Sequence, residues 1–168
     1  MRNRTSEEPA ALPSDDLESA LVDLMQEQQH ALFNFALAIT HDNDVADDCC
    51  QHAFVRAYEQ LKRGKAVNKA WLYTVTRNAA IDALRRRRHE RPSMLLDNEA
   101  EKPGADTSSI RAALDQLAPG DREVLYLFVV DRFPAKDIAG MLGVRPEAVY
   151  MRISRARERL RKLYGDKR

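Results

Sequence analysis

Apolar side chains recur every three or four residues through the first half of the chain, a spacing typical of helices with one buried face. The first stripe comprises Leu17, Leu21, Leu24, Leu32, Phe35 and Ile39. The second comprises Ala46, Cys50, Ala53, Phe54, Ala57 and Leu61, and the third comprises Trp71, Leu72, Val75, Ala79 and Leu84. We expect Asp15 or Asp16 to cap the first helix and Asn68 to cap the third. Polar residues 41–44 separate the first two helices, and Gly64 and Pro92 are the expected ends of the second and third. The pattern predicts one small three-helix bundle.

The second half of the chain also predicts helices, after an acidic stretch at residues 93–107 that holds Pro103-Gly104 and is expected to be a linker. Its apolar residues 94–96 could dock on a neighbouring element. Later helices are marked by Ile110, Leu114 and Leu117 and then by Val124, Leu125 and Phe128. No stretch has a convincing strand pattern, so we predict an all-α chain. The expected divisions are a disordered tail (1–14), a helical domain (15–92), a flexible linker (93–107) and a second helical domain (108–168).

Residues 133–163 have the pattern of a helix-turn-helix. Gly143 suits the sharp turn, and Pro146 suits the first turn of the second helix, where its missing N–H is not needed. The predicted buried stripe of that helix comprises Val149, Ile153, Ala156 and Leu160. With about 100° between successive residues, the opposite face comprises Glu147, Ala148, Tyr150, Met151, Ser154, Arg155 and Glu158. A helix fits the major groove of DNA, so this face is the candidate reader, and Arg152, Arg157, Arg159 and Arg161 flank it as phosphate contacts.

The net charge of +1 conceals four blocks of alternating sign. Residues 1–60 carry −9, residues 61–92 carry +8, residues 93–144 carry −4 and residues 145–168 carry +6. Two separated basic segments predict two contacts with a polyanion. The acidic segments favour other partners or simple solubility.

Several classes of function are disfavoured by what the sequence lacks. No apolar run approaches the roughly 18 residues of a membrane span, so we expect a cytoplasmic protein with no membrane insertion of its own. The pair Cys49-Cys50 lies near His52, but adjacent helical side chains diverge by about 100° and no second ligand pair is evident. We therefore expect small core residues there, with no metal and no cofactor. No catalytic constellation or phosphate-binding glycine loop is visible, so we do not expect an enzyme.

Three segments resemble the extracytoplasmic-function (ECF) group of sigma-70-type sigma factors. Ile138-Ala139, Leu142-Gly143 and Ser154-Arg155-Ala156-Arg157 are similar to the helix-turn-helix of region 4 in that family. ADDCCQHAFVRAY (46–58) and AWLYTVTRNAAIDALRRRR (70–88) resemble successive parts of region 2. The resemblance covers residues 17–92 and 108–163. It implies an alternative sigma factor that directs RNA polymerase to promoters.

The resemblance also implies a role for each segment. Core polymerase, through the clamp helices of its β′ subunit, would be bound by Asp47, Asp48, Gln51 and Arg56. The −10 element would be melted and read by Lys65, Asn68, Lys69, Tyr73, Arg77, Asn78, Arg85 and Arg86. The −35 element would be read by Arg145, Glu147, Ala148, Tyr150, Met151, Arg152, Ser154, Arg155 and Arg157. The β flap of polymerase and an anti-sigma factor are the other implied partners. Because unpaired bases are held by stacking and by a basic track, Tyr73 is the better stacking candidate of the two aromatic residues, and Trp71 is expected to lie in the core.

The recognition helix departs from the usual family pattern at Arg145, Ala148, Tyr150 and Met151. Tyr and Met cannot make the bidentate guanine contact of an arginine, so we predict an atypical −35 sequence with apolar contacts such as thymine methyl groups. Two other functions remain open. An adaptor that only sequesters an anti-sigma factor would not need the two basic segments, and a regulator of duplex DNA that acts without polymerase would not need the motifs of residues 46–88.

Overall fold

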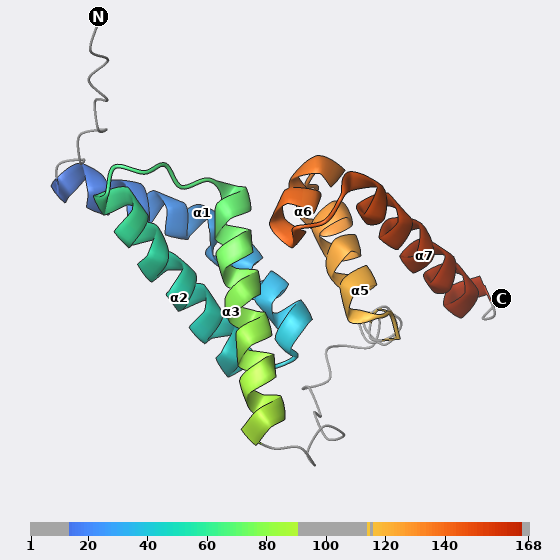
Figure 1. Cartoon of the computed structure of the whole chain (residues 1–168). Helices are drawn as coiled ribbons and strands as arrows, with labels where there is room; N and C mark the ends of the chain where they lie inside the picture. Colours follow the sequence, from blue (N-terminus) through green and yellow to red (C-terminus); the bar gives the residue numbers. More distant parts are fainter. Residues whose placement is uncertain (1–13, 91–113, 115, 166–168) are drawn as a thin grey trace, which may run out of the picture.

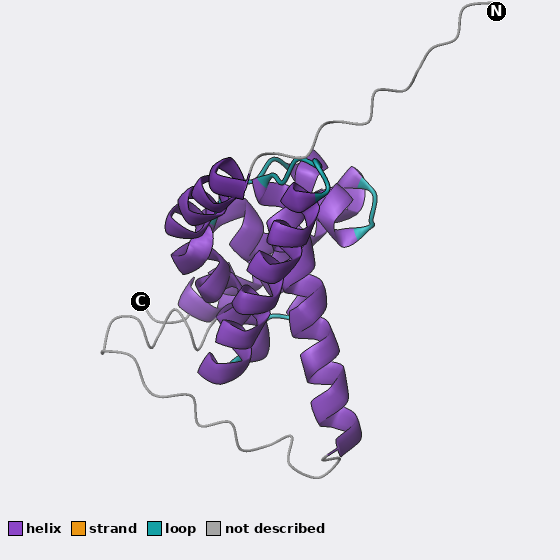
Figure 2. Cartoon of the chain, turned by 90° about the vertical axis from the view of Figure 1, so that its left-hand side faces the viewer, coloured by secondary structure: helices purple, strands orange, loops and turns teal. Residues whose placement is uncertain are grey.

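The computed structural model describes residues 14–90, 114 and 116–165, and they are helical with short connections (Figures 1 and 2). The helices are α1 (Ser14–Thr40), α2 (Asn43–Lys62), α3 (Lys69–Glu90), α5 (Pro119–Leu125), the π-helical segment η1 (Tyr126–Val130), α6 (Ala135–Leu142) and α7 (Pro146–Gly165). No strand occurs in these ranges, which confirms the all-α prediction. Residues 1–13 of the expected tail (1–14), the linker with its apolar residues 94–96 and most of the helix expected around Ile110 lie outside the described residues, and Ser14 is the first residue of α1.

Helices α1, α2 and α3 form the predicted three-helix bundle, in which every pair of helices is in contact. The buried side chains of α2 are mostly small, because Ala46, Ala53 and Ala57 are inaccessible to solvent and Cys49 and Cys50 are nearly so. Small side chains let neighbouring helices approach closely. Larger core residues such as Leu32, Phe35 and Leu72 come from α1 and α3, and α2 adds Phe54.

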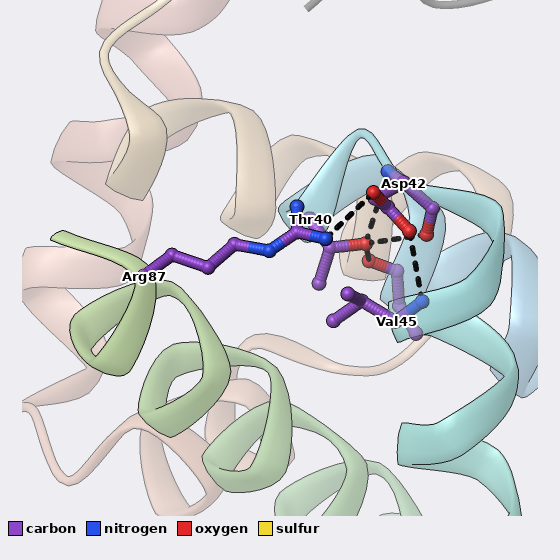
Figure 3. Close-up of polar contacts among 5 residues, drawn as sticks. Thr40, Asp42, Val45 and Arg87 are labelled. Atoms are coloured by element: carbon purple, nitrogen blue, oxygen red, sulfur yellow. Dashed lines mark hydrogen bonds and ion pairs between the residues drawn. The ribbon is translucent and has the colours of Figure 1, made fainter. Parts of the chain in front are cut away.

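Side-chain caps set the starts of α2 and α3. The Asp42 carboxylate accepts a hydrogen bond from the Val45 N–H at 2.9 Å (Figure 3), and Asn68 Oδ1 accepts one from the Trp71 N–H at 2.8 Å, as predicted. The expected cap of α1 is wrong, because the helix begins at Ser14 and residues 15 and 16 lie in its first turn. Sequence alone cannot separate neighbouring polar residues at a helix start, because each is compatible with the first turn.

The C-terminal unit consists of α5, η1, α6 and α7, with α7 packed on α5 and α6. Gly143 ends α6 in the left-handed conformation with φ of +63°, and the Val144 N–H donates to the Ala139 carbonyl at 3.0 Å. This closes the helix with the bonding expected of a glycine cap. The predicted stripe of α7 is confirmed, since Val149, Ile153 and Ala156 are buried.

The bundle and the C-terminal unit share one connected hydrophobic core. Helix α6 contacts α3, while α5 and η1 contact α1 (Figure 1). The ring of Tyr73 lies 4.9 Å from that of Phe133, and the ring of Phe35 lies 5.8 Å from that of Tyr126. The sequence predicted two modules connected by a linker; the structure adds a packed interface between them, made by apolar faces that are distant in sequence.

Candidate nucleic-acid interface

The outer face of α7 presents most of the predicted −35 residues to solvent. Tyr150 and Met151 are 60% and 62% exposed, the highest values among the large hydrophobic residues of the described chain. Glu147, Ser154 and Arg155 are also exposed, whereas Ala148 is half-buried. Because the buried stripe is fixed against α5 and α6, this reading face of α7 is turned outward over several helical turns.

The contacts that the α7 arginines make with other described residues are weak. Arg155 forms an ion pair with Asp121 at 3.3 Å but remains largely exposed, and such exposed pairs contribute little. The guanidinium of Arg157 lies 5.5 Å from the centre of the Phe128 ring. Arg145 is exposed and Arg152 is half-buried. Cations on both sides of the reading face are thus available to phosphate groups.

The predicted −10 residues divide into two groups. Lys65, Asn68, Asn78, Arg85 and Arg86 are exposed on α3 and on the loop before it, although the Asn68 side chain is engaged in capping. The remaining three, at positions 69, 73 and 77, contact the C-terminal unit and are partly or wholly covered by it.

Tyr73 does not point outward as the sequence analysis expected. It is 0% exposed, and its ring lies between those of Phe35, at 5.0 Å, and Phe133, at 4.9 Å. Burial and the nearby Asp131 carboxylate raise the pKa of its hydroxyl. Trp71, expected in the core, is only half-buried and packs at the edge of the core. The expectation for Tyr73 is wrong because the C-terminal unit covers the side of α3 that carries Tyr73, whereas Trp71 does pack against the core.

The helical spacing of three residues in α3 could have revealed this second buried face from the sequence. Tyr73, Thr76 and Ala80 are spaced by three and four residues, and none is exposed. The stripe through residues 71, 72, 75 and 79 concealed it, because α3 has apolar or small residues around much of its circumference.

Lys69 and Arg77 are also engaged by the C-terminal unit. The Lys69 Nζ lies 4.8 Å from the centre of the Phe133 ring and donates to the Asp131 carbonyl at 3.4 Å. The guanidinium of Arg77 makes two hydrogen bonds to the Glu123 carboxylate, and these side chains are only 20% and 10% exposed. Both cations are therefore paired within the chain.

The arginine side chains at the end of α3 do not form one continuous exposed surface. Arg87 turns back to the junction of α1 and α2, where its Nη2 lies 2.8 Å from Asp42 Oδ2 (Figure 3). The hydrogen bond from the Val45 N–H and the pairing with Arg87 lower the pKa of Asp42. Arg85 and Arg86 remain exposed.

The four predicted polymerase-binding residues lie on the solvent face of α2. Gln51 donates to Asp47 at 2.7 Å, and Arg56 pairs with Glu59 at 3.2 Å. Beside them, an open groove of about 610 Å³ is lined by Leu21, Met25, Gln29, Asp47, Cys50, Gln51, Phe54, Val55 and Tyr58. The exposed apolar side chains of Val55 and Tyr58 were not singled out from the sequence. An apolar groove with a polar rim has the chemistry of a protein-docking surface.

Cys49 and Cys50 are both buried, as expected of core residues. Burial, with a smaller contribution from Cys49 and Asp47, raises the pKa of the Cys50 thiol to about 12. The thiol therefore stays protonated and unreactive at neutral pH. Among the residues that the structure describes, no group of three or more potential metal ligands comes together, and none of the described helices has the length and apolarity needed to span a bilayer.

An outward face on a helix-turn-helix, a second basic helix and an apolar groove on one helical chain are the arrangement typical of DNA-binding proteins that also dock on a protein partner. Residues 24–90 match the family model of Sigma-70 region 2, and residues 107–160 match that of Sigma-70, region 4. The chain belongs to the sigma-70 family, within its ECF group.

Similar proteins include the probable RNA polymerase sigma factor RfaY of Xanthomonas campestris, 35% identical over 79% of this chain and 37% of that protein. The RNA polymerase sigma factor CarQ of Myxococcus xanthus is 29% identical over 90% of this chain and 93% of that one. This chain thus spans little over a third of the first relative and nearly all of the second. Among solved structures, the sigma factor RpoE in complex with the anti-sigma factor NepR, from Bartonella quintana, has a TM-score of 0.75 and 26% identity; the match covers 92% of this chain and 99% of that one.

Proposed function

We propose that this chain is an alternative sigma factor that directs core RNA polymerase to a particular set of promoters. The observation that carries the proposal is the outward face of α7, which the buried stripe and the left-handed turn at Gly143 hold away from the core. A helix presented in this way fits the major groove, where base edges can be distinguished.

The reading face of α7 is assigned to the −35 element and the exposed residues of α3 to the −10 element. Arg155 and Arg157 would meet phosphates, while Tyr150 and Met151 would make apolar contacts with base edges. Lys65 on the loop before α3, together with Arg85 and Arg86 on α3, supplies the basic track for an unpaired strand. The catalytic step of transcription belongs to polymerase, and this chain supplies promoter selectivity.

The outer face of α2 and the neighbouring groove are assigned to core polymerase. The carboxylates of Asp47 and Asp48 would meet basic groups of the clamp helices, and the apolar groove beside them would supply buried area. The C-terminal unit is assigned to the β flap, and an anti-sigma factor is the expected regulator. Work with polymerase implies a cytoplasmic location.

Run-off transcription with core polymerase and genomic DNA tests the proposal. We expect selective transcripts that core polymerase alone does not produce. Arg155→Ala should reduce promoter selection while leaving the affinity for core polymerase unchanged. Arg56→Ala should weaken the affinity for core polymerase while leaving the promoter preference unchanged. If the chain adds no selective initiation above core alone, the assignment fails. Gel shifts on promoter duplexes without polymerase then distinguish a self-sufficient DNA regulator from an adaptor that binds only protein.

A further inference from the structure

Arg157 lies at one edge of the reading face of α7, beside an open cleft. A turn of about 100° per residue places it about two turns beyond Tyr150 on the same edge. The cleft has a volume of about 350 Å³ and is lined by Tyr150, Ile153, Ser154, Arg157, Glu158 and Arg161. A phosphate of a bound duplex therefore has room to approach Arg157 from solvent.

The contact that holds Arg157 is an aromatic ring. Its guanidinium carbon lies 5.5 Å from the centre of the Phe128 ring, within the roughly 6 Å at which a cation is attracted to the face of an aromatic ring. Arg155, by contrast, pairs with the Asp121 carboxylate at 3.3 Å. A carboxylate occupies guanidinium N–H groups that a phosphate would need, whereas a ring attracts the cation and leaves these donors available.

Phe128 is fixed more firmly than the arginine that it faces. It belongs to η1, where the Asp131 N–H donates to the Tyr126 carbonyl at 3.3 Å and closes a turn of the wider π type. Such turns are rare and occur frequently at functional sites. The Phe128 ring is half-buried and packs against the hydrophobic core, whereas the Arg157 side chain is exposed. The ring is therefore the fixed partner, and the guanidinium is the group that it orients.

We propose that Phe128 is a positioning residue for promoter binding: its ring holds the Arg157 guanidinium beside the reading face of α7, where it binds a phosphate of the −35 duplex. The proposal rests on the assignment of α7 to the −35 element. It adds a residue of η1, outside the helix-turn-helix itself, to those that determine the strength of promoter binding.

The ring acts by lowering the entropic cost of binding. An exposed arginine side chain has many rotamers, and a contact with DNA fixes it in a few of them. The ring restricts these rotamers before DNA arrives, so part of that entropy is already lost in the free protein. At an exposed site the attraction corresponds to roughly a two- to fivefold change in an equilibrium constant. This is the size of effect to expect on DNA affinity.

The test uses the full chain assembled with core polymerase. It measures the affinity of this holoenzyme for the duplex that the wild-type holoenzyme enriches from a random pool. Phe128→Leu removes the π face and keeps an apolar side chain, and Phe128→Tyr keeps the ring. The matched control is Tyr126→Leu, which removes a ring of the same segment that packs on Phe35 of α1. Urea denaturation checks that each variant is folded.

We expect Phe128→Leu to weaken binding roughly two- to fivefold, and Phe128→Tyr and Tyr126→Leu to leave it unchanged. Once Arg157→Ala is present, Phe128→Leu should have no further effect, because the ring acts through the guanidinium. Replacing Phe128 by phenylalanines with one, two and three fluorine atoms should weaken binding in steps, since fluorine withdraws negative charge from the ring face. A role in packing alone would not give this order.

The proposal and the proposed function fail on different results. If Arg157→Ala weakens binding but Phe128→Leu has the same effect with and without it, Phe128 acts through packing, and the proposal fails while the assignment of α7 stands. Equal affinities of the wild type and the fluorinated variants would also refute the proposal, as would an Arg157→Ala variant that binds normally. A wild-type holoenzyme that enriches no duplex refutes the proposed function, and the positioning role fails with it.

Discussion

Asp42 lies between α1 and α2, and its carboxylate links the start of α2 to the end of α3, so its replacement should destabilise the protein in separable steps. Its carboxylate caps α2 through the Val45 N–H at 2.9 Å and pairs with Arg87 of α3 at 2.8 Å. The neighbouring Thr40 hydroxyl donates to the Ala36 carbonyl at the end of α1. That bond does not involve the Asp42 side chain and should survive its replacement.

The contacts of Asp42 set the loss in free energy of unfolding that is expected for each replacement. Asp42→Asn keeps an oxygen for the cap and loses only the partly exposed ion pair, which costs about 0.2–1 kcal/mol. Asp42→Ala loses the cap as well, and the total should reach about 1–2.5 kcal/mol. Urea denaturation followed by circular dichroism measures both values. In a double-mutant cycle, Asp42→Asn should no longer change the free energy of unfolding when Arg87→Ala is already present.

The ion pair also predicts a pH dependence. The pKa of Asp42 is lowered from 3.8 in the folded chain, first by the Val45 N–H and then by Arg87. A depressed folded pKa means that this stabilisation is present above pH 3.8 and is lost as the pH falls through the lower folded value. The gap between wild type and Asp42→Asn should therefore close in acid. Equal stabilities of Asp42→Asn and Asp42→Ala would refute the cap, and a gap that does not change with pH would refute the ion pair.

Two further predictions concern the helix-turn-helix. Gly143→Ala should destabilise the chain by about 1–2 kcal/mol because of its left-handed φ. The matched Gly140→Ala, inside α6 with open space at the new methyl group, should stabilise the chain by up to about 1 kcal/mol. Melting temperatures that shift in the same direction for both variants would contradict this. Tyr150→Ala and Met151→Ala should weaken the preference for thymine in duplexes selected from a random pool with polymerase holoenzyme. Replacing thymine by uracil in the selected sites should weaken binding of the wild type but not of these variants, and a wild-type selection that returns the usual family −35 consensus would contradict the apolar contacts.

Much of the fold follows from local patterns in the sequence. The periodicity of α7 places Val149 and Ile153 inside and Tyr150 outside, because successive side chains turn by about 100° on any helix. Asn68 caps its helix and Gly143 ends another for reasons contained within a few residues. Such features do not depend on how the rest of the chain packs, and the sequence therefore predicted the residues at which they occur.

The contacts between distant faces were decided only by the tertiary structure. Tyr73 belongs to a helix that has two apolar sides, and periodicity cannot tell which side meets the bundle and which meets another unit. Arg77 and Arg87 lie 46 and 45 residues from their acidic partners, so nothing in their neighbourhood distinguishes them from the exposed Arg85. A cation on an isolated helix is free to bind DNA. Whether it remains free depends on which acidic side chain the folded chain brings against it.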